Sequence, residues 1–369
     1  MSPEGAETPS DGADAPMSPQ GDEANPWGGR PDEPTGRRGP TARPKSSRFK
    51  RHEMTRPWLA ILAAVVLLPV VLRQAIATEI WIFAIFGLGL NLLLGYTGLL
   101  SFGQATFFGS AAYVGGYLLK HYGTNVFLVL ALGVIVGAVS AAAVGYLCAQ
   151  RSGLYFIMLT FALNQMFYFT AYQWTSVTGG EDGMPGVPRP RLFGVGLDDS
   201  LAYYAFAAAL FLVSLWVMKR IVESPLGKIL VAIRENEPRA EAVGYDAARF
   251  KLLAFVIGGA FSGLAGVLYA MLFGIVPLEA IGFVFSGNVV FATLIGGSGS
   301  LYGPLIGSFV FIWLSESVSV MWQRWPLLLG VAFVIVVLFL RGGVVEAWAR
   351  FWSWRAGRRA APVTEPGNS

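Results

Sequence analysis

The hydrophobic residues of this chain form long blocks separated by short polar or glycine-rich joints, starting near residue 57. A helix that crosses a bilayer needs about 20 mostly apolar residues. The pattern therefore predicts ten spans, near residues 57–73, 79–95, 104–119, 125–147, 153–172, 201–218, 251–275, 286–299, 304–321 and 325–340. The eighth has only about 14 residues, too few for a full crossing, which indicates a half-helix or a re-entrant segment backed by protein.

The first 56 residues are predicted to be a disordered tail, because they are rich in Pro, Gly, Ser and charge and show no apolar periodicity. Residues 1–29 carry six acids and no Lys or Arg, whereas residues 30–56 carry nine bases and three acids. We expect the basic half to lie against anionic lipid headgroups beside the first span. A signal peptide fits poorly, since its charged n-region is short; Met17 and Met54 remain alternative starts. The predicted divisions are a tail (1–56), a transmembrane domain (57–340) and a second tail (341–369).

Lys and Arg collect on the cytoplasmic side of membrane proteins, and this bias predicts the orientation. The stretch 219–251 holds seven bases and the tail from Arg341 holds five, while 172–200 holds two bases against four acids. We therefore expect 172–200 on the outer side of the inner membrane and both termini in the cytoplasm, which requires an even number of spans. A few basic residues in the short connections between spans fall on the predicted outer side. The Lys and Arg bias therefore holds for the long connections and the tails but not for every short connection.

Composition narrows the class of protein and excludes several kinds of chemistry. Hydrophobic residues make up 54% of the chain and charged residues 14%, with a mean hydropathy of +0.55, whereas charged residues are roughly a quarter of an ordinary soluble domain. The single cysteine, Cys148, has no companion for a disulfide or a zinc site, and the two histidines are far apart. No span carries paired carboxylates or a nucleophile motif. We expect a membrane protein without a metal, cofactor or nucleic-acid partner, and not an enzyme.

Two glycine-rich joints stand out between predicted spans. GYTGLLSFGQATFFG starts at Gly95 and IGGSGSLYGPLIG starts at Ile295, and each connects an inward-running span to an outward-running one. The two joints resemble each other only weakly, so the pattern favours an internal duplication of the chain no more than it favours no duplication. Small residues let helices approach closely, which accounts for most of these glycines. The other interpretation is that broken helices here expose backbone dipoles to a translocation path.

The predicted cytoplasmic segment 219–250 contains two amphipathic pieces. The apolar positions of the first recur at helical spacing: Leu226, Ile229, Leu230 and Ile233. In the second, Asn236 fits an N-cap before EPRAEAV, and Gly244 follows as a C′ glycine. A short capped helix with small alanines is shaped to fit a groove of another protein. An ordinary solvated loop with helix capping explains the same residues equally well.

This segment resembles the cytoplasmic coupling loop of permeases in binding-protein-dependent ABC importers. Their motif of Glu, Ala, Ala, three residues and Gly is approximated by Glu241, Ala242, Val243 and Gly244, although glycine follows too soon here. Branched-chain amino-acid permeases of the LivM type match more closely, in SPLGK, AIRENEPRAEAVGYD and KLLAFVIGGAFSGLAGVLYA. Further blocks match in order over most of residues 80–340: GYTGLLSFGQATFFGSAAYVGGYL, GLYFIMLTFALNQ, TGGEDGMPGVP and IGGSGSLYGPLIG.

The resemblance implies an all-α polytopic permease like those of type II ABC importers. Such a permease works with a LivH-type partner permease, two ATP-binding subunits and an extracytoplasmic binding protein. ATP would be bound by a partner, and the chain has no GxxxxGK[ST] phosphate loop of its own. The residues implied to couple to the ATPase are Arg234, Glu235, Glu237, Arg239 and Glu241 through charge, and Ala240, Ala242 and Gly244 through close fit. The loop from Thr178 to Pro188 would contact the binding protein or be an uninvolved surface connection.

Amide side chains within the spans are the candidates for lining the path: Asn91, Gln104, Asn164, Gln165 and Asn288. Each should face the bundle interior because polar groups are costly in lipid, and hydrogen bonding between helices accounts for them equally well. The expected cargo is a branched-chain or other hydrophobic amino acid, with urea or a short-chain amide as the alternative. The rival class is a stand-alone secondary transporter or channel, which would need ionisable groups at mid-membrane, and none is clear.

Overall fold

The computed structural model describes residues 71–123, 125–149, 151, 153–192 and 195–321, with isolated positions on either side. The chain divides into two compact units, Met1–Met54 and Thr55–Ser369, and every described residue belongs to the second. The predicted N-terminal tail lies outside the described residues, as do nearly all of the C-terminal tail and most of the first and tenth predicted spans.

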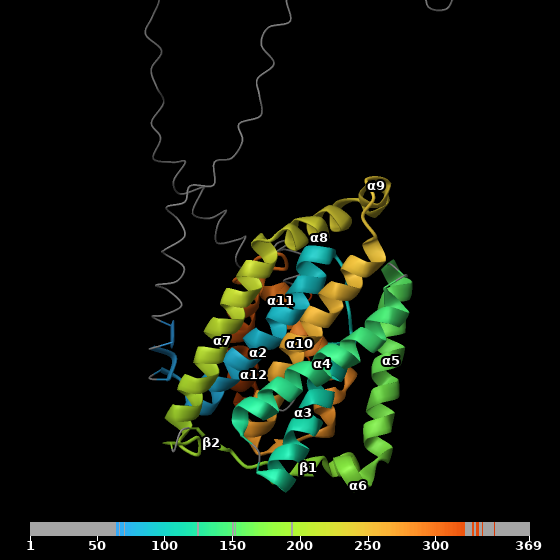
Figure 1. Cartoon of the computed structure of the whole chain (residues 1–369). Coiled ribbons are helices and arrows are strands. Elements are labelled where there is room, and N and C mark those ends of the chain that lie inside the picture. Colours follow the sequence, from blue (N-terminus) through green and yellow to red (C-terminus); the bar gives the residue numbers. More distant parts are fainter. Residues whose placement is uncertain are drawn as a thin grey trace, which may run out of the picture. The chain divides into compact units, whose positions relative to one another are not determined.

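The described part of the second unit is mainly α-helical (Figure 1). Its long helices are α2 (Gln74–Asn91), which continues as the π-helix η2 (Leu92–Thr97), then α3 (Gln104–Tyr122), α4 (Val126–Cys148), α5 (Gly153–Gln173), α7 (Ser200–Glu223), α10 (Ala247–Phe273) and α12 (Gly303–Met321). Its shorter helices are α6 (Thr175–Thr178), α8 (Pro225–Glu235), α9 (Glu237–Ala242) and α11 (Phe283–Gly296), with 3-10 turns η3 (Gly180–Asp182) and η4 (Leu278–Ile281). Within the described range, five helical segments are long and apolar enough to cross a membrane: Gln74–Thr97, Val126–Cys148, Gly153–Gln173, Ser200–Glu223 and Ala247–Phe273.

Helices α2 and α10 lie at the centre of this unit. Both are apolar, and both are buried around most of their circumference, as expected for helices covered on all sides by others. They contact each other, and both take part in a core rich in aromatic side chains. Trp81 of α2 packs on Phe211 of α7, and Phe86 packs on Phe108 of α3. The core therefore forms around α2 and α10.

Glycines bring α4 and α10 into backbone contact. Gly137 of α4 lies against Gly259 and Gly263 of α10, and Gly263 in turn lies against Gly133. A Cβ on Gly137, Gly259 or Gly263 would overlap a backbone carbonyl oxygen of the opposite helix. Small residues at such spacing are how helices approach closely in membranes. These helix glycines, which the sequence analysis did not single out, therefore have a packing role.

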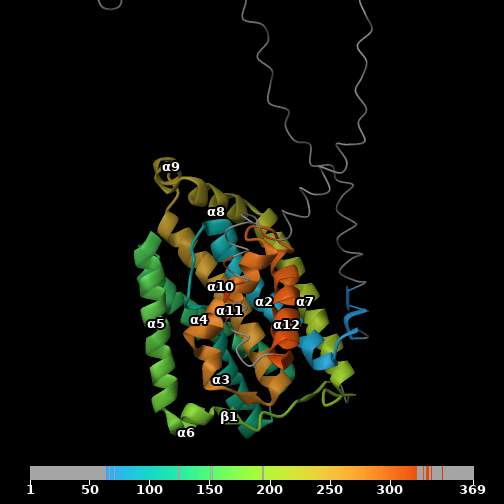
Figure 2. The same cartoon turned by 180° about the vertical axis from the view of Figure 1, so that it is seen from behind.

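The two long connections lie at opposite ends of the helices, as both views show (Figures 1 and 2). Helices α8 and α9, between α7 and α10, lie at one end, and α6 with β1 lies at the other. The short strands form two antiparallel pairs: β1 (Met184–Pro185) with β4 (Ile275–Val276), and β2 (Arg191–Leu192) with β3 (Val195–Gly196). The loops predicted to face opposite sides of the membrane are thus separated by the length of the helices.

Several helix ends differ from the predicted spans. The sixth span was expected to end at residue 218, but α7 continues to Glu223, where Lys219 and Glu223 form an i,i+4 pair with an N–O distance of 3.9 Å. Helix α10 begins at Ala247, earlier than expected, because Asp246 caps it by accepting from the Arg249 amide. The eighth span is the 14-residue helix α11, as its length predicted.

Candidate coupling site and polar interior

Helix α8 packs one apolar face on the bundle. It starts with Pro225 at its first turn, where a missing amide proton costs nothing. Leu230 and Ile233 are buried, while Leu226 and Ile229 are partly covered, so the helical spacing seen in the sequence marks the packed face. The helix contacts α7, α10 and the π-helix η2. Helix α8 is therefore held on the bundle along its length.

Helix α9 has the caps that the sequence predicted. The Asn236 side chain accepts from the Arg239 amide at 3.0 Å at the start of the helix. At the end, the Gly244 amide donates to the Glu241 carbonyl and the Tyr245 amide donates to the Ala240 carbonyl, which is a Schellman motif. Gly244 has φ +100°, a conformation that favours glycine. The six-residue helix α9 therefore has a defined cap at each end.

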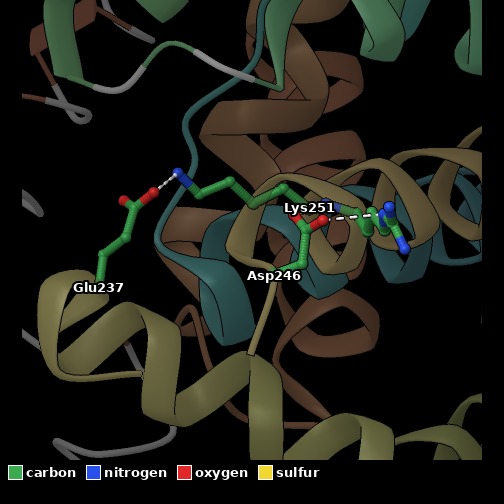
Figure 3. A network of polar contacts seen from close by, with 4 residues as sticks. Glu237, Asp246 and Lys251 are labelled. Carbon is green, nitrogen blue, oxygen red and sulfur yellow. Dashed lines mark hydrogen bonds and ion pairs between the residues drawn. The ribbon is translucent and has the colours of Figure 1, made fainter. Parts of the chain in front are cut away.

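Helix α9 is fastened to the start of α10 on its inner side. Ala240 packs with Ile233 of α8 and Ala247 of α10 in a small apolar cluster. The Lys251 ammonium, on a side chain only 2% exposed, pairs with the Glu237 carboxylate at 2.5 Å. Figure 3 shows these two side chains pointing toward one another, with Asp246 beside them capping α10. One apolar and one ionic contact therefore join α9 to α10.

The residues predicted to couple to an ATPase divide into two groups. Three of them contact their own chain: Ala240 is 6% exposed, Glu237 pairs with Lys251, and the Arg234 guanidinium donates to the Gly95 carbonyl. Arg234 is nevertheless exposed, as are the remaining five: Glu235, Arg239, Glu241, Ala242 and Gly244. Ala240 packs inside the protein because it faces α8 and α10. The sequence motif alone did not indicate this burial.

Two exposed apolar side chains join this outer surface and were not singled out from the sequence. Val243 is 74% exposed and Tyr245 is 42% exposed, directly after α9. These two side chains add apolar area to the charged surface that α9 presents. The sequence feature that could have identified them is their position on either side of Gly244, the glycine that ends α9. We call Glu235, Arg239, Glu241, Ala242, Val243, Gly244 and Tyr245 the α9 surface.

Arg234 brings the end of α8 to both glycine-rich joints. Its guanidinium donates to the Gly95 carbonyl in η2, and its aliphatic stem lies over Gly98. Gly95 is itself in backbone contact with Gly299 of the second joint. Asn91 of α2 closes the arrangement: its side chain donates to the Ser300 carbonyl and accepts from the Gly299 amide, both at 2.9 Å. We call this set, Asn91, Gly95, Gly98, Arg234, Gly299 and Ser300, the glycine junction.

Two of the remaining predicted amides lie in a buried polar cluster. Asn164 of α5 donates to the Thr106 hydroxyl at 2.8 Å and to the Ile281 carbonyl at 3.0 Å. The Gln104 side chain accepts from the Ser262 hydroxyl at 2.8 Å. Their other polar atoms, Gln104 Nε2 and Asn164 Oδ1, are buried without a hydrogen-bond partner. These amides join α3, α5, α10 and η4 in the interior, as the burial argument predicted.

The last two amides are less buried. Gln165 and Asn288 are half-buried on α5 and α11. Together with Asn91 in the glycine junction, the five candidates are therefore distributed over α2, α3, α5 and α11. Among the residues that the structure describes, no three His, Cys, Asp or Glu side chains come together as a candidate metal site, and Cys148 is buried.

The connection between α5 and α7, which was predicted to lie on the outer side, is docked on the end of α10. Its strand β1 pairs with β4, and the Gly186 and Val187 amides both donate to the Gly274 carbonyl. Arg189 donates to the Met271 and Leu272 carbonyls at 3.0 and 2.7 Å, and these are among the last carbonyls of α10, which lack helical partners. Glu181 and Asp182 remain exposed. The TGGEDGMPGVP block thus forms a fixed surface with an acidic tip.

Comparison with known proteins identifies the family. The family model described as branched-chain amino acid transport system / permease component matches residues 72–341. The high-affinity branched-chain amino acid transport system permease protein LivM of Salmonella typhimurium is 28% identical over 313 residues, 78% of this chain and 74% of that protein. LivM of Escherichia coli is 29% identical over 73% of this chain and 69% of that protein. LivH of Escherichia coli is 25% identical over 70% of this chain and 88% of that protein.

No solved structure matches the chain. The family match covers every membrane-crossing helix described above and both glycine-rich joints. The coupling segment α8–α9 also lies inside it. The chain is therefore a multi-pass membrane protein that belongs to the family of permease components of branched-chain amino acid transport systems.

Proposed function

We propose that this permease is the translocating subunit of an ATP-driven importer for branched-chain or other hydrophobic amino acids, and that an ATPase subunit binds its α9 surface. The observation that carries the proposal is the two-sided construction of α9. Its inner side is bound to α8 and α10 through Ala240 and Glu237, while its outer side presents exposed apolar and charged residues that no described element covers. Because α9 is attached to α8 and α10 on its inner side and exposed on its outer side, a partner bound to the outer side could move α8 and α10.

The contacts of α10 supply a route from that surface into the membrane. Lys251 and Ala247, which hold α9, belong to the first turns of α10. Helix α10 in turn packs on α2, α3 and α4, with the glycines of α4 in backbone contact. Closely packed helices move as rigid bodies rather than bend. Displacement of α9 by an ATPase would therefore move α10 and the helices packed on it.

The cargo and the partners are inferred from the relatives. LivM of two bacteria is named for high-affinity branched-chain amino acid transport, and LivH carries the same description. We propose a second, LivH-type permease and an extracytoplasmic binding protein that docks at the outer loop, near Glu181 and Asp182. In this arrangement α8 and α9 face the cytoplasm, ATP is bound by the partner ATPase subunits, and the binding protein provides most of the selectivity.

Co-purification tests the ATPase contact directly. The full chain is purified in detergent from membranes that contain the complete importer, and the amount of ATPase that accompanies it is measured. Glu241→Lys and Val243→Asp alter the α9 surface and should lower the bound ATPase by about tenfold or more, as expected for interface residues at a hot spot. Lys228→Glu, an exposed charge reversal on α8, is the matched control and should retain the ATPase.

An outcome in which no ATPase accompanies the wild-type chain would contradict the proposal and favour a stand-alone transporter. Loss of the ATPase in the Lys228→Glu control as well as in the α9 variants would remove the assignment to the α9 surface. The cargo is tested separately, by uptake of radiolabelled leucine and urea into vesicles that contain the whole importer and ATP. Uptake of leucine but not urea is expected, and the reverse result would assign the alternative substrate class.

A further inference from the structure

Arg234 is exposed at the end of α8, but its guanidinium also contacts the bundle. Its guanidinium is turned toward the bundle and donates to the Gly95 carbonyl, and its stem lies over Gly98. Gly299 of the second joint lies close to the same guanidinium. One side chain from the end of α8 therefore reaches both glycine-rich joints at once, although the joints are about 200 residues apart in sequence.

The two joints need an external support of this kind. Gly95 lies in the π-helix η2 that ends the α2 segment, and the last carbonyls of η2 lack helical amides to accept from. Gly98 has φ +74° and Gly299 has φ +88°, so neither position offers a side chain that could fasten the joint. Asn91 supplies one support from α2, and Arg234 supplies the other from α8.

We propose that Arg234 is a positioning residue that locks the end of α8 to both glycine-rich joints, so that movement of α8 and α9 releases the two joints together. The inference rests on the proposed function, because an ATPase bound at α9 would provide that movement. The joints connect α2 to α3 and α11 to α12, so their release would free four helix ends at the side of the bundle where the ATPase acts. Arg234 thus acts through the glycine junction and not by touching the ATPase.

The first measurement is hydrogen–deuterium exchange on the purified full chain, which needs no partner. Arg234→Gln removes the charged donor and should speed exchange about tenfold in peptides covering residues 92–100 and 297–303, since a hydrogen bond from a charged donor is worth that order of protection. Arg234→Lys keeps a donor and should restore part of the protection. Lys228→Gln, which removes an exposed charge from the same helix, should leave both joints unchanged.

The second measurement separates coupling from folding in the complete importer. Arg234→Gln should bind the wild-type amount of ATPase and hydrolyse ATP within about twofold of wild type, while amino-acid uptake per ATP falls about tenfold. Loss of ATPase binding with unchanged exchange in the joints would show that Arg234 touches the ATPase and would overturn the proposal. Unchanged uptake per ATP would also overturn it. Failure of the proposed function itself is distinct, because the wild-type chain would then carry no ATPase.

Discussion

At the scale of single residues, the polar side chains of this permease mainly fasten segments of its own chain to one another. Glu237 binds Lys251, Asn91 bridges two residues of the second joint, and Arg189 binds the end of α10. Each of these groups is desolvated at least in part, so each needs its partner. The cost of removing one partner then exceeds the gain from the contact itself, and that asymmetry can be tested.

Glu237→Gln should destabilise the protein because it leaves the Lys251 ammonium buried without a carboxylate. We expect a loss of about 1 to 2 kcal/mol, reduced by the partial exposure of Glu237, with less loss in Lys251→Met. The double variant should be no less stable than Glu237→Gln alone. Thermal unfolding of the detergent-purified chain measures the cycle, and additive losses would contradict a coupled pair.

The matched control for this cycle is the neighbouring ion pair of Asp246 and Arg249. The Arg249 side chain is 86% exposed and pairs with Asp246 at 2.8 Å. Exposed pairs contribute about 0 to 1 kcal/mol. Arg249→Met should therefore shift the unfolding temperature far less than Glu237→Gln does.

Asn164→Ala should weaken the packing of α5 on the bundle. It removes the hydrogen bonds to Thr106 and Ile281, leaving a buried carbonyl unsatisfied at a cost of about 1 to 3 kcal/mol. Gln165→Ala, one residue along and only half-buried, is the control and should be close to neutral. The measurement is the unfolding temperature together with protease sensitivity of α5. Equal losses of unfolding temperature in the two variants would show that the buried hydrogen bonds of Asn164 do not stabilise the protein.

At the scale of helices, the contact between α4 and α10 depends on the absence of side chains. Gly137 and Gly263 meet across this contact with no room for a Cβ. A larger residue there must push the two helices apart, and overpacking in a tight core costs about 1 to 3 kcal/mol or more. Since α10 also holds α9 through Lys251 and Ala247, this contact would position the proposed ATPase-binding surface as well as the core.

Gly263→Val should reduce the yield of folded protein and lower its unfolding temperature, because the new side chain overlaps the Gly133 carbonyl. The control is Gly287→Ala in α11, where a Cβ meets no neighbouring atom within 4 Å. Helix propensity alone predicts that this control is neutral or stabilising, by up to about 1 kcal/mol. Fluorescence size-exclusion chromatography after a heating series measures both variants. A tolerated Gly263→Val would contradict the close approach.

At the scale of the whole molecule, the two long connections lie at opposite ends of the membrane-crossing helices. Basic residues gather in the connection that holds α8 and α9, whereas acids outnumber bases in the one that holds β1. The charge bias predicts that the first lies in the cytoplasm and the second outside. In the proposed importer, this orientation would let one end meet an ATPase and the other a binding protein.

Cysteine labelling in intact cells tests that orientation. Val243→Cys after α9 should resist a membrane-impermeant maleimide until the cells are opened, whereas Pro185→Cys in the outer loop should react at once. Both positions are exposed, so accessibility within the fold does not limit either reaction. The native Cys148 is buried and serves as the background. Immediate labelling of Val243→Cys in intact cells would reverse the assigned topology.

The sequence predicted the membrane class, the order of the helices from 79 to 321, and the capped helix at Asn236 to Gly244. These follow from local rules: the length of an apolar block, the side-chain acceptor at an N-cap, and the positive φ of a C′ glycine. The resemblance in the coupling segment also indicated the family, which the family match confirmed. The total of ten spans and the disordered tail stay predictions.

The tertiary structure alone decided which polar residues meet. Arg234 and Gly95 are 139 positions apart, and Asn91 and Ser300 are 209 apart, so no local pattern links them. The same holds for Ala240, whose burial depends on how α9 packs against α8 and α10. Local composition determines whether a segment enters the membrane and where it starts and stops, because those choices depend on neighbours in sequence. Which residues form the glycine junction and which form the exposed α9 surface depends on contacts between helices that are distant in sequence. Only folding brings those helices together.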